Sequence, residues 1–433
     1  FAIAACFFFF LRNKKVKLSI SGGIILVAAA WVSAGILGAL PLCISDIIPN
    51  FADALFESVS GFTTTGATIL TDIEACPITM HVWRTEMHWL GGMGIVALTV
   101  ALFPLLGVGG FHLIKSETTG PDKGKVTAKI THTAKALWFI YLGMTIVQII
   151  LLMLAGLSFI EAMCHTFASL GTGGFSTRNA SVGGFNSPAV EIICGVFMIL
   201  AGVNFSLYFY LFTGHPEEFF HNSELKAYLK IVFVSTVLIA LSIYPIYGIG
   251  GGLRQSFFQV ASVITTTGFS TADYNAWPEF AKMVLFFLMF VGGCSGSTAG
   301  SIKVIRWLIL QKQAGMEAKR LLSPHGVFGI QLNNRPGRKD IVYSVAGFMF
   351  CYFLLTLITA LVAAADGADL LSGFTASLAL IGNIGPGFGS VGPAGNFAFF
   401  SSPVKIFFSF IMLAGRLELY TMIIYFMPAF WKR

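Results

Sequence analysis

Four short stretches rich in glycine or threonine recur along the chain, and each follows an apolar run. They read "GFTTTGAT", "SLGTGGFST", "VITTTGFST" and "LIGNIGPGFG". Glycine permits backbone angles that other residues avoid, and extended strands that turn their carbonyl oxygens towards one axis replace the hydration shell of a cation. The chemistry that these residues suggest is ion coordination by backbone oxygens. The alternative is a set of ordinary surface turns, because threonine and glycine favour turns in many proteins.

The four stretches are in register when they are aligned on a single glycine. The positions eleven and seven residues earlier are then apolar in every copy. The aligned glycines are Gly66, Gly174, Gly268 and Gly385, preceded by Leu55, Met163, Phe257 and Phe374 and by Val59, Phe167, Ala261 and Leu378. This register predicts a fourfold internal repeat and favours ion-coordinating loops over surface turns.

The composition places these loops in a membrane protein. Of the 433 residues, 56% are hydrophobic and only 11% are charged, far from the balance of a soluble domain. Apolar segments of about 20 residues are long enough to cross a hydrocarbon core of roughly 30 Å as helices. Residues 1–17 are expected to be the end of an additional N-terminal transmembrane helix plus a basic cytoplasmic linker. Eight spans are predicted after it, near residues 20–44, 86–112, 135–157, 188–213, 228–250, 280–311, 340–365 and 402–431.

Each repeat is predicted to run from a span through a half-length helix and a glycine loop to a second span. The apolar part of each half-helix has ten to twelve residues, which is typical of a re-entrant segment. We expect an all-α polytopic membrane protein with four parallel repeats of span, pore helix, filter loop and span around a pseudo-fourfold central pore. Two spans per repeat put all four loops on one side, unlike the inverted repeats of many secondary transporters. The expected repeats are residues 18–114, 115–225, 226–338 and 339–433.

The basic residues predict the orientation. They concentrate around 11–17, 115–135, 215–230 and 303–339, so these segments are expected to face the cytoplasm and the glycine loops to face outside. The outer segments carry more acidic than basic residues, and a negative vestibule would concentrate cations. The same excess is also expected if acids simply occupy outer loops from which no rule excludes them.

The second span of the third repeat has an unusual composition. A pair of small residues recurs in the second span of every repeat, but only the third copy continues into "GGCSGSTAGS". Its four glycines, Gly292, Gly293, Gly296 and Gly300, would each weaken a helix by about 1 kcal/mol relative to alanine. The stretch therefore favours an intramembrane loop over the alternative, a helix that packs closely through small residues.

Arg416 lies near the middle of the last predicted span, next to Gly415. A charge at that depth is expensive and should face a polar cavity or a partner. Glu418 is the nearest acid, but residues two apart do not share a helix face, so a structural pair between them is the less favoured alternative. We expect Arg416 to lie in the conduction path, where its charge repels a cation and its donors reach residues 294–300.

These motifs resemble the Trk/Ktr/HKT superfamily of potassium ion transporters, and most closely its bacterial Trk-type membrane subunits. The likeness covers nearly the whole chain and rests on "SVSGFTTTGAT", "HTFASLGTGGFSTRN", "ITTTGFSTADYN", "GNIGPGFGSVGP", "HWLGGMGIVAL" and "GGCSGSTAGSIKV". The fourth loop, "NIGPG", departs most from the others. The resemblance implies a potassium filter formed by Thr65, Gly66, Gly173, Gly174, Thr267, Gly268, Ile384 and Gly385. It also implies a gate formed by Gly292, Gly293, Ser295, Gly296, Ser297, Thr298, Gly300 and Arg416.

The resemblance further implies a multi-pass protein of the bacterial cytoplasmic (inner) membrane, a homodimer, and a separate cytosolic nucleotide-binding regulatory subunit (TrkA-like). No cofactor is expected in this chain, because the nucleotide would bind to that subunit, and potassium is the transported ion. The basic segment 305–339 is a candidate docking surface for the subunit, although the positive-inside rule alone explains the same charges. No nucleic-acid partner is expected.

Enzyme signatures are absent from the sequence. The stretch "GGCSGSTAGS" lacks the lysine of a phosphate-binding loop, and "WRTEMHW" at 83–89 is interpreted as the start of a helix at the membrane interface. Two function classes remain. One is channel-like potassium uptake, and the other is a secondary transporter that couples potassium flux to a sodium or proton gradient. The parallel repeats and the scarcity of intramembrane acids favour the first.

Overall fold

The structure, a computed structural model, describes residues 20–101, 130–323, 329, 331–332, 335–336 and 339–431. The helix end expected at 1–17, the last part of the span predicted to reach residue 112 and parts of segment 305–339 lie outside these residues. Nearly all the regular structure is helical. The exception is a hairpin of two-residue strands, β1 (Gln331–Leu332) and β2 (Arg335–Pro336), which the all-α prediction did not include.

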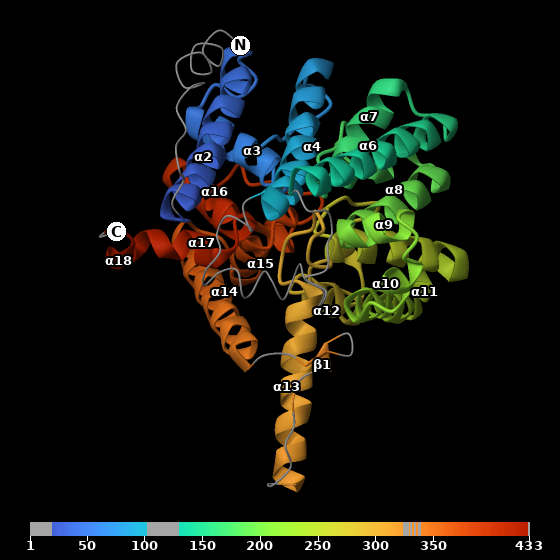
Figure 1. Cartoon of the computed structure of the whole chain (residues 1–433). Helices are drawn as coiled ribbons and strands as arrows, with labels where there is room; N and C mark the ends of the chain where they lie inside the picture. Colours follow the sequence, from blue (N-terminus) through green and yellow to red (C-terminus); the bar gives the residue numbers. More distant parts are fainter. Residues whose placement is uncertain are drawn as a thin grey trace.

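The helices follow the predicted order of span, pore helix, loop and span in each of the four repeats (Figure 1). The first repeat holds α2 (Ile20–Ile44), α3 (Phe51–Phe62) and α4 (Ile78–Ala101). The second holds α6 (Ile130–Leu154), α7 (Phe159–Leu170), α8 (Pro188–Ala201), α9 (Phe205–Phe212) and α10 (Pro216–Phe220). The third holds α11 (Ser223–Ile264), α12 (Glu279–Leu288) and α13 (Val304–Leu322). The fourth holds α14 (Lys339–Ala365), α15 (Leu370–Ile381), α16 (Ser402–Arg416), α17 (Leu419–Ile423) and α18 (Pro428–Trp431). Short 3₁₀ turns occupy Ser181–Phe185, Tyr274–Ala276, Gly389–Val391 and Ile424–Phe426.

Three of the four pore helices are separate helices of twelve residues, α3, α7 and α15. The side chains of Asn50, Ser158 and Asp369 cap their first turns by accepting a hydrogen bond from a backbone N–H. The third pore helix is the last part of α11, which bends at Gly248 (φ 67°) and begins at Ser223, inside the repeat that was expected to end at residue 225. Each pore helix ends four residues before an aligned glycine, at Phe62, Leu170, Ile264 and Ile381.

The spans predicted at 188–213 and 402–431 are interrupted in the structure, and the span predicted at 280–311 contains the loop that its glycines indicated. The breaks lie at or near the pair of small residues: α8 ends at Ala201 and the α8–α9 pair is bent by 90°, α16 ends at Arg416, and α12 ends at Leu288, just before Gly292. Among the described residues, four helices are long and apolar enough to cross a membrane, or five if the bent α8–α9 pair is one span. The small residues permit close packing against the pore helices. A Cβ built on Gly415, for example, would overlap the carbonyl oxygen of Ile381.

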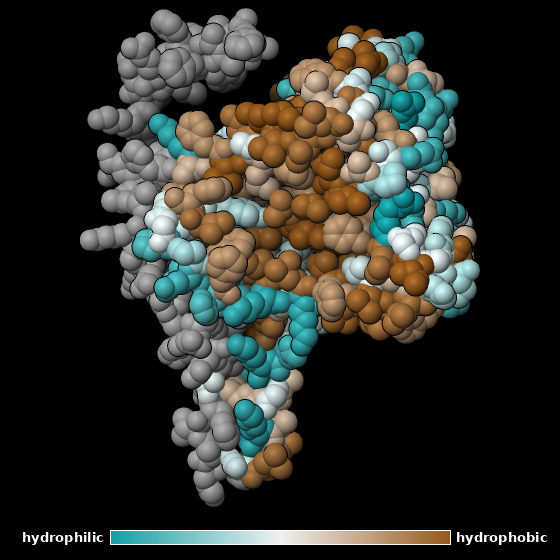
Figure 2. Space-filling model, turned by 90° about the vertical axis from the view of Figure 1, so that its right-hand side faces the viewer, coloured by the Kyte–Doolittle hydropathy of each residue, from teal (hydrophilic) through white to brown (hydrophobic). Residues whose placement is uncertain are grey.

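Helix α13 projects away from the rest of the molecule (Figure 1). Its first turns are buried, whereas Leu321 and Leu322 at its far end are 85% exposed. Figure 2 shows hydrophobic side chains over most of the visible face of the main body, with hydrophilic ones where the projection leaves it. Such an extended apolar surface is expected of a body embedded in a membrane.

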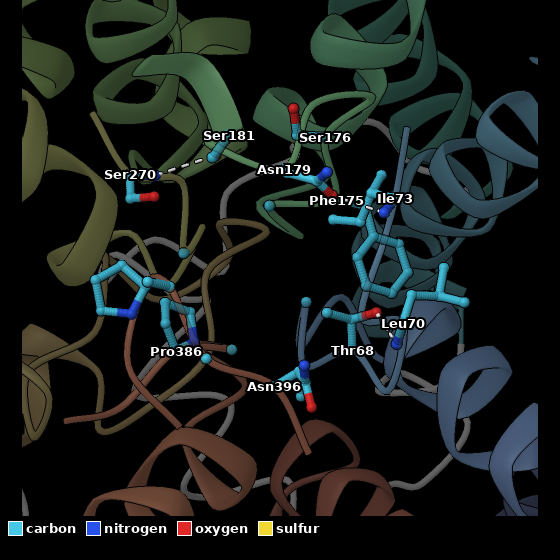
Figure 3. A pocket seen from close by; sticks show the side chains of 18 of the residues that line it. Thr68, Leu70, Ile73, Phe175, Ser176, Asn179, Ser181, Ser270, Pro386 and Asn396 are labelled. Atoms are coloured by element: carbon cyan, nitrogen blue, oxygen red, sulfur yellow. Dashed lines mark hydrogen bonds between the residues drawn. The ribbon is translucent and has the colours of Figure 1, made fainter. Parts of the chain in front are cut away.

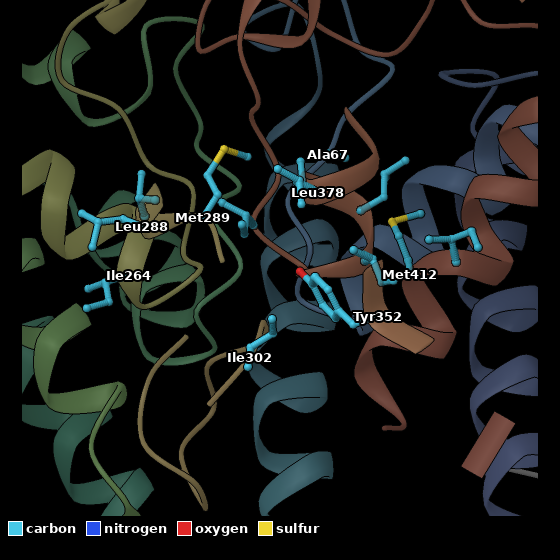
Figure 4. Close-up of a cluster of buried hydrophobic side chains, with 14 of the residues drawn as sticks. Ala67, Ile264, Leu288, Met289, Ile302, Tyr352, Leu378 and Met412 are labelled. Carbon is cyan, nitrogen blue, oxygen red and sulfur yellow. The ribbon is translucent and has the colours of Figure 1, made fainter. Parts of the chain in front are cut away.

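A large cluster of buried apolar side chains joins the repeats at the centre of the molecule. Hydrophobic association is weak between helices in lipid, so tight packing of such side chains has to hold them together. The cluster includes residues of the loops, such as Ala67 and Ile384, so the loops are part of this buried core. Figure 4 shows members from the first, third and fourth repeats: Ala67, Ile264, Leu288, Met289, Ile302, Tyr352, Leu378 and Met412.

Candidate ion-conduction site

The four glycine loops share one backbone conformation. Two residues before each aligned glycine, a residue with a side chain has a positive φ: 54° at Thr64, 54° at Thr172, 55° at Thr266 and 53° at Asn383. The aligned glycines themselves have φ values between 79° and 95°. Placing every second residue in the left-handed region turns successive carbonyl groups towards the same side of the strand. The fourth loop has this conformation too, despite its different sequence.

The loops close into a ring in which each repeat contacts the next. A Cβ built on any aligned glycine would meet the backbone of the following loop. On Gly66, Gly174 and Gly268 it would overlap a carbonyl oxygen, and on Gly385 it would lie 2.6 Å from the carbonyl oxygen of Thr65. The carbonyl groups in question belong to Gly173, Thr267, Ile384 and Thr65. The eight predicted filter residues are therefore brought together, and the ring has no room for a side chain at the glycines.

A cavity of about 150 Å³ lies against one side of the ring (Figure 3). It is lined by the aligned glycines and by the residues that follow them, such as Thr68, Phe175, Ser270 and Pro386. In Figure 3 side chains from all four loops surround this space. The cavity is therefore a mouth of the ring, on the side that the charge pattern predicts to face outside, and we call it the outer cavity.

A hydrogen-bonded acid lies beside the mouth. Asn179 Nδ2 donates to Asp72 Oδ1 at 2.9 Å, and this bond lowers the pKa of Asp72 below its ordinary value. The carboxylate of Asp72 is thus charged at neutral pH, one source of negative potential outside the ring.

Every described lysine and arginine of the segments predicted to face outside is paired with an acid. The five pairs have N–O distances between 2.6 and 3.0 Å, and they are Arg84–Glu57, Arg178–Glu161, Arg254–Glu191, Lys282–Glu279 and Lys405–Asp53. The negative surplus therefore comes from the remaining carboxylates, such as Asp46, Asp72 and Asp273. The ion pairs leave the net negative charge unchanged but assign it to these unpaired positions.

Threonine hydroxyls form hydrogen bonds within two of the loops, and one amide links the fourth loop to the first. Thr65 shares a hydrogen bond of 2.7 Å with the hydroxyl of Thr63, and Thr267 has the same bond to Thr265. Asn383 Nδ2 of the fourth loop donates to Thr65 Oγ1 of the first at 2.9 Å. These hydrogen bonds stabilise the conformation of the loops just below the aligned glycines.

Residues 289–303 lie outside any helix, so the intramembrane-loop interpretation is confirmed against the packed-helix alternative. The loop contacts the ends of three pore helices. Thr298 Oγ1 donates to Leu170 O at 3.0 Å, Gly300 N donates to Thr266 Oγ1 at 2.7 Å, and Ser301 N donates to Gly382 O at 2.8 Å. It therefore lies directly beneath the ring, on the side opposite the outer cavity.

The other gate candidates hold the intramembrane loop in its compact shape. Cys294 N donates to Gly202 O at 2.8 Å, and the Ser297 hydroxyl donates to Cys294 O at 2.6 Å. The two ends of the loop are paired with each other, since Gly292 N donates to Ile302 O at 2.9 Å. Similar bonds to neighbouring segments involve Gly293, which accepts from Val304, and Gly296, which accepts from Phe205.

Arg416 is buried (4% exposed) and reaches the same loop. Its Nη1 donates to Thr298 O at 2.7 Å, and its Nη2 lies 3.4 Å from Gly91 O. The hydroxyl of Thr172, in the second filter loop, donates to the same Thr298 oxygen at 2.9 Å. Two hydrogen bonds in series thus connect the guanidinium to the filter.

The alternative pair between Arg416 and Glu418 is not formed. Glu418 has a φ of 63° and interrupts the helix of the last span. Its carboxylate instead forms an ion pair with Arg306 of α13, with 2.6 Å between Arg306 Nη2 and Glu418 Oε2. Arg306 also lies 3.7 Å from the centre of the Phe348 ring. The charge of Arg416 is therefore held by backbone carbonyl groups.

Sequence reasoning missed Glu224, the buried carboxylate that fixes the intramembrane loop. Its Oε1 accepts from Ser295 N at 2.7 Å and from Ile305 N at 3.2 Å, and its Oε2 accepts from Ser295 Oγ at 3.1 Å. One side chain thereby joins the starts of α11 and α13 to the loop. The available signal was an acid immediately before a long apolar span, but the same pattern is common in the first turn of any helix.

The comparisons with known proteins assign the family. Residues 1–241 and 225–433 match the profile of TrkH, described as a cation transport protein. The chain belongs to the TrkH family. Its similarity to TrkH-family relatives extends over almost the full length of both chains. It is 39% identical to the Trk system potassium uptake protein TrkH of Escherichia coli (strain K12), over 97% of this chain and 88% of the relative.

Other relatives in the TrkH family agree. The chain is 34% identical to the Trk system potassium uptake protein TrkG of Escherichia coli (strain K12), over 100% of this chain and 90% of that protein. It also resembles the crystal structure of the potassium transporter TrkH from Vibrio parahaemolyticus, with a TM-score of 0.89 and 36% identity over 100% of this chain and 91% of that one. The four-repeat fold is thus the TrkH fold, and the chain is a multi-pass membrane protein.

Proposed function

We propose that this chain takes up potassium by channel-like conduction through the ring of four loops. The observation that carries the proposal is the shared alternation of positive φ in four loops that pack into a single ring. Such loops present carbonyl oxygens to a dehydrated cation. The names of the relatives, potassium uptake proteins, agree with potassium as the ion. The eight residues predicted for the filter would bind it.

We place the gate at the intramembrane loop and Arg416. The loop lies under the filter and is bonded to three of the four pore-helix ends, so ions leaving the ring have to pass it. The guanidinium adds a positive charge at the same level, held by Thr298 O. Conduction therefore requires that the loop and Arg416 move away together.

Helix α13 is our candidate for transmitting regulation. It begins immediately after the intramembrane loop, which lies on the side of the ring opposite the cavity, and it projects from the body (Figure 1). Lys319 and Arg320 lie in its exposed last turn. We propose that a cytosolic nucleotide-binding subunit (TrkA-like) docks there and pulls on the loop, and that the chain works as a homodimer in the cytoplasmic membrane with its filter outside. The nucleotide would belong to that subunit.

The test is flux in proteoliposomes. Potassium uptake is measured while the membrane potential and the sodium and proton gradients are varied independently. Uptake that follows the potassium electrochemical gradient alone is the expected result. Uptake that stops when the sodium or proton gradient is collapsed would instead favour the secondary-transporter alternative.

A further inference from the structure

The carboxylate of Glu57 lies inside the first pore helix, α3, and is fully buried (0% exposed). Its Oε1 accepts from Thr68 Oγ1 at 2.9 Å, and its Oε2 accepts from the backbone N–H of Ile69 at 3.0 Å. Thr68 and Ile69 lie in the non-helical segment that follows the filter glycine and leads away from the filter. We call this segment, and its equivalents in the other repeats, the outer strand of the loop. Glu57 therefore holds this strand by both a side-chain and a backbone contact.

Arg84 of α4 completes the charge pair. Its Nη2 lies 2.7 Å from Glu57 Oε1, its Nε donates to the same oxygen at 2.9 Å, and Arg84 is 1% exposed. Its guanidinium carbon is 4.0 Å from the centre of the Phe175 ring, a cation–π contact. Phe175 follows the filter glycine Gly174 in the second loop. One buried arginine therefore touches the outer strands of two adjacent loops.

One helical turn further along α4, His88 makes a second link between the same loops. Its Nδ1 is 2.7 Å from Gly61 O at the end of the first pore helix, and Phe175 N lies 3.3 Å from its Nε2. A Cβ on Gly173 would overlap the His88 ring. The segment interpreted from sequence as an interfacial helix start is thus a buried brace between the first and second filter loops.

In the second and third repeats, the residues equivalent to Glu57 also contact the outer strand of their own loop, but neither of them forms an ion pair there. Nine residues before the aligned glycine stand His165 and Gln259 in those repeats. His165 Nε2 lies 2.9 Å from Ser176 Oγ, and Gln259 Nε2 lies 3.4 Å from Phe269 O, both in the outer strands of their own loops. In the fourth repeat the position is Ala376. Only the first repeat uses an ion pair there.

We propose that the Glu57–Arg84 pair is a positioning element that keeps the outer strands of the first and second filter loops at the spacing that favours potassium over sodium. The inference rests on the proposed function. Removing the two charges weakens the hold on both the Thr68–Ile69 segment and Phe175 while leaving the carbonyl ring itself unaltered in sequence. The filter would then tolerate a smaller, more strongly hydrated ion, because carbonyl groups that are less firmly held adjust to it.

Two variants test the proposal. The double substitution Glu57→Gln with Arg84→Met removes both charges at once, so that no unpaired charge remains buried. The single substitution Thr68→Val keeps the ion pair and the side-chain shape but cuts the hydroxyl link to the filter strand. The matched control is Asp53→Asn with Lys405→Met, which removes another ion pair of the same pore helix, in which Lys405 Nζ lies 2.8 Å from Asp53 Oδ1.

The measurement is uptake of radioactive rubidium into proteoliposomes containing the full-length chain, inhibited by unlabelled potassium or sodium. The ratio of the two half-inhibitory concentrations reports selectivity independently of the amount of active protein. We expect the double variant to reduce the sodium-to-potassium ratio by about tenfold, which corresponds to roughly 1.4 kcal/mol of relative binding. Thr68→Val should reduce it by about threefold, roughly half that free energy, and the control should leave it unchanged.

Each result decides for or against the proposal. An unchanged ratio in monodisperse double variant and Thr68→Val protein overturns it, and if the double variant does not fold, Thr68→Val alone decides. If the control variant lowers the sodium-to-potassium ratio as far as the double variant does, the proposal is also overturned, because the cause would then be a general loosening of α3. A parent protein that shows no preference for potassium would instead refute the proposed function itself.

Discussion

Replacing Arg416 tests whether a fixed charge closes the pore. The guanidinium Nη1 is joined to the Thr172 hydroxyl by hydrogen bonds of 2.7 and 2.9 Å through Thr298 O. A cation at the bottom of the filter would therefore lie on the order of 6 Å from the charge, and at an effective dielectric constant of about 20 the repulsion is about 3 kcal/mol. That barrier corresponds to roughly a hundredfold in rate.

Two substitutions separate charge from hydrogen bonding. Arg416→Ala removes both, while Arg416→Lys keeps the charge but loses the planar set of donors. We expect flux without any regulatory subunit to rise by up to about a hundredfold in Arg416→Ala and to reach an intermediate level in Arg416→Lys. If the barrier is set by charge alone, Arg416→Lys should remain near the parent, and if hydrogen bonds latch the loop, both variants should conduct strongly.

The assay is potassium flux into proteoliposomes at a fixed membrane potential, with purified parent and variants at equal protein content. Size-exclusion profiles and thermal unfolding establish that each variant is folded. Thr298 O keeps its bond from Thr172 when Arg416 is replaced, so the loop is not left with an unpaired carbonyl. Folded variants that all conduct like the parent would remove Arg416 from the mechanism.

Three further predictions concern the filter and the loop. Replacing Gly66, Gly174 or Gly268 by serine should relax the preference for potassium in the competition assay, because φ is positive there and a Cβ would overlap the next loop. If all three variants keep the parent's sodium-to-potassium ratio of half-inhibitory concentrations, the filter assignment is refuted. Deleting residues 293–300 should raise flux without a partner. The deletion is feasible because Val291 and Ile302 already pair across the gap, and a folded variant that conducts no better than the parent would make the loop a packing element. Glu224→Gln should loosen the loop and raise the flux measured without a partner severalfold, because it loses about 1 kcal/mol of charge-assisted hydrogen bonding. The control Glu217→Gln, in the exposed helix α10, should leave that flux unchanged.

Several features could be predicted from the sequence because their causes are local. A backbone that needs positive φ selects glycine, so the aligned glycines marked the loops and their register disclosed the fourfold repeat. Short apolar runs before each loop indicated half-length helices, and three of them are helices of twelve residues. The glycine content of residues 292–300 indicated the intramembrane loop for the same reason, since each glycine weakens a helix.

The choice of partners was decided only by the tertiary structure. Glu418 is two residues from Arg416 in sequence but pairs with Arg306, and Arg416 binds a carbonyl group 118 residues away. Arg84 and His88 have the sequence appearance of an interfacial helix start, yet packing places them against two filter loops. A buried charge or donor has to be satisfied by whatever the packed fold brings within about 3 Å, and no local pattern of residues specifies which distant segment that is.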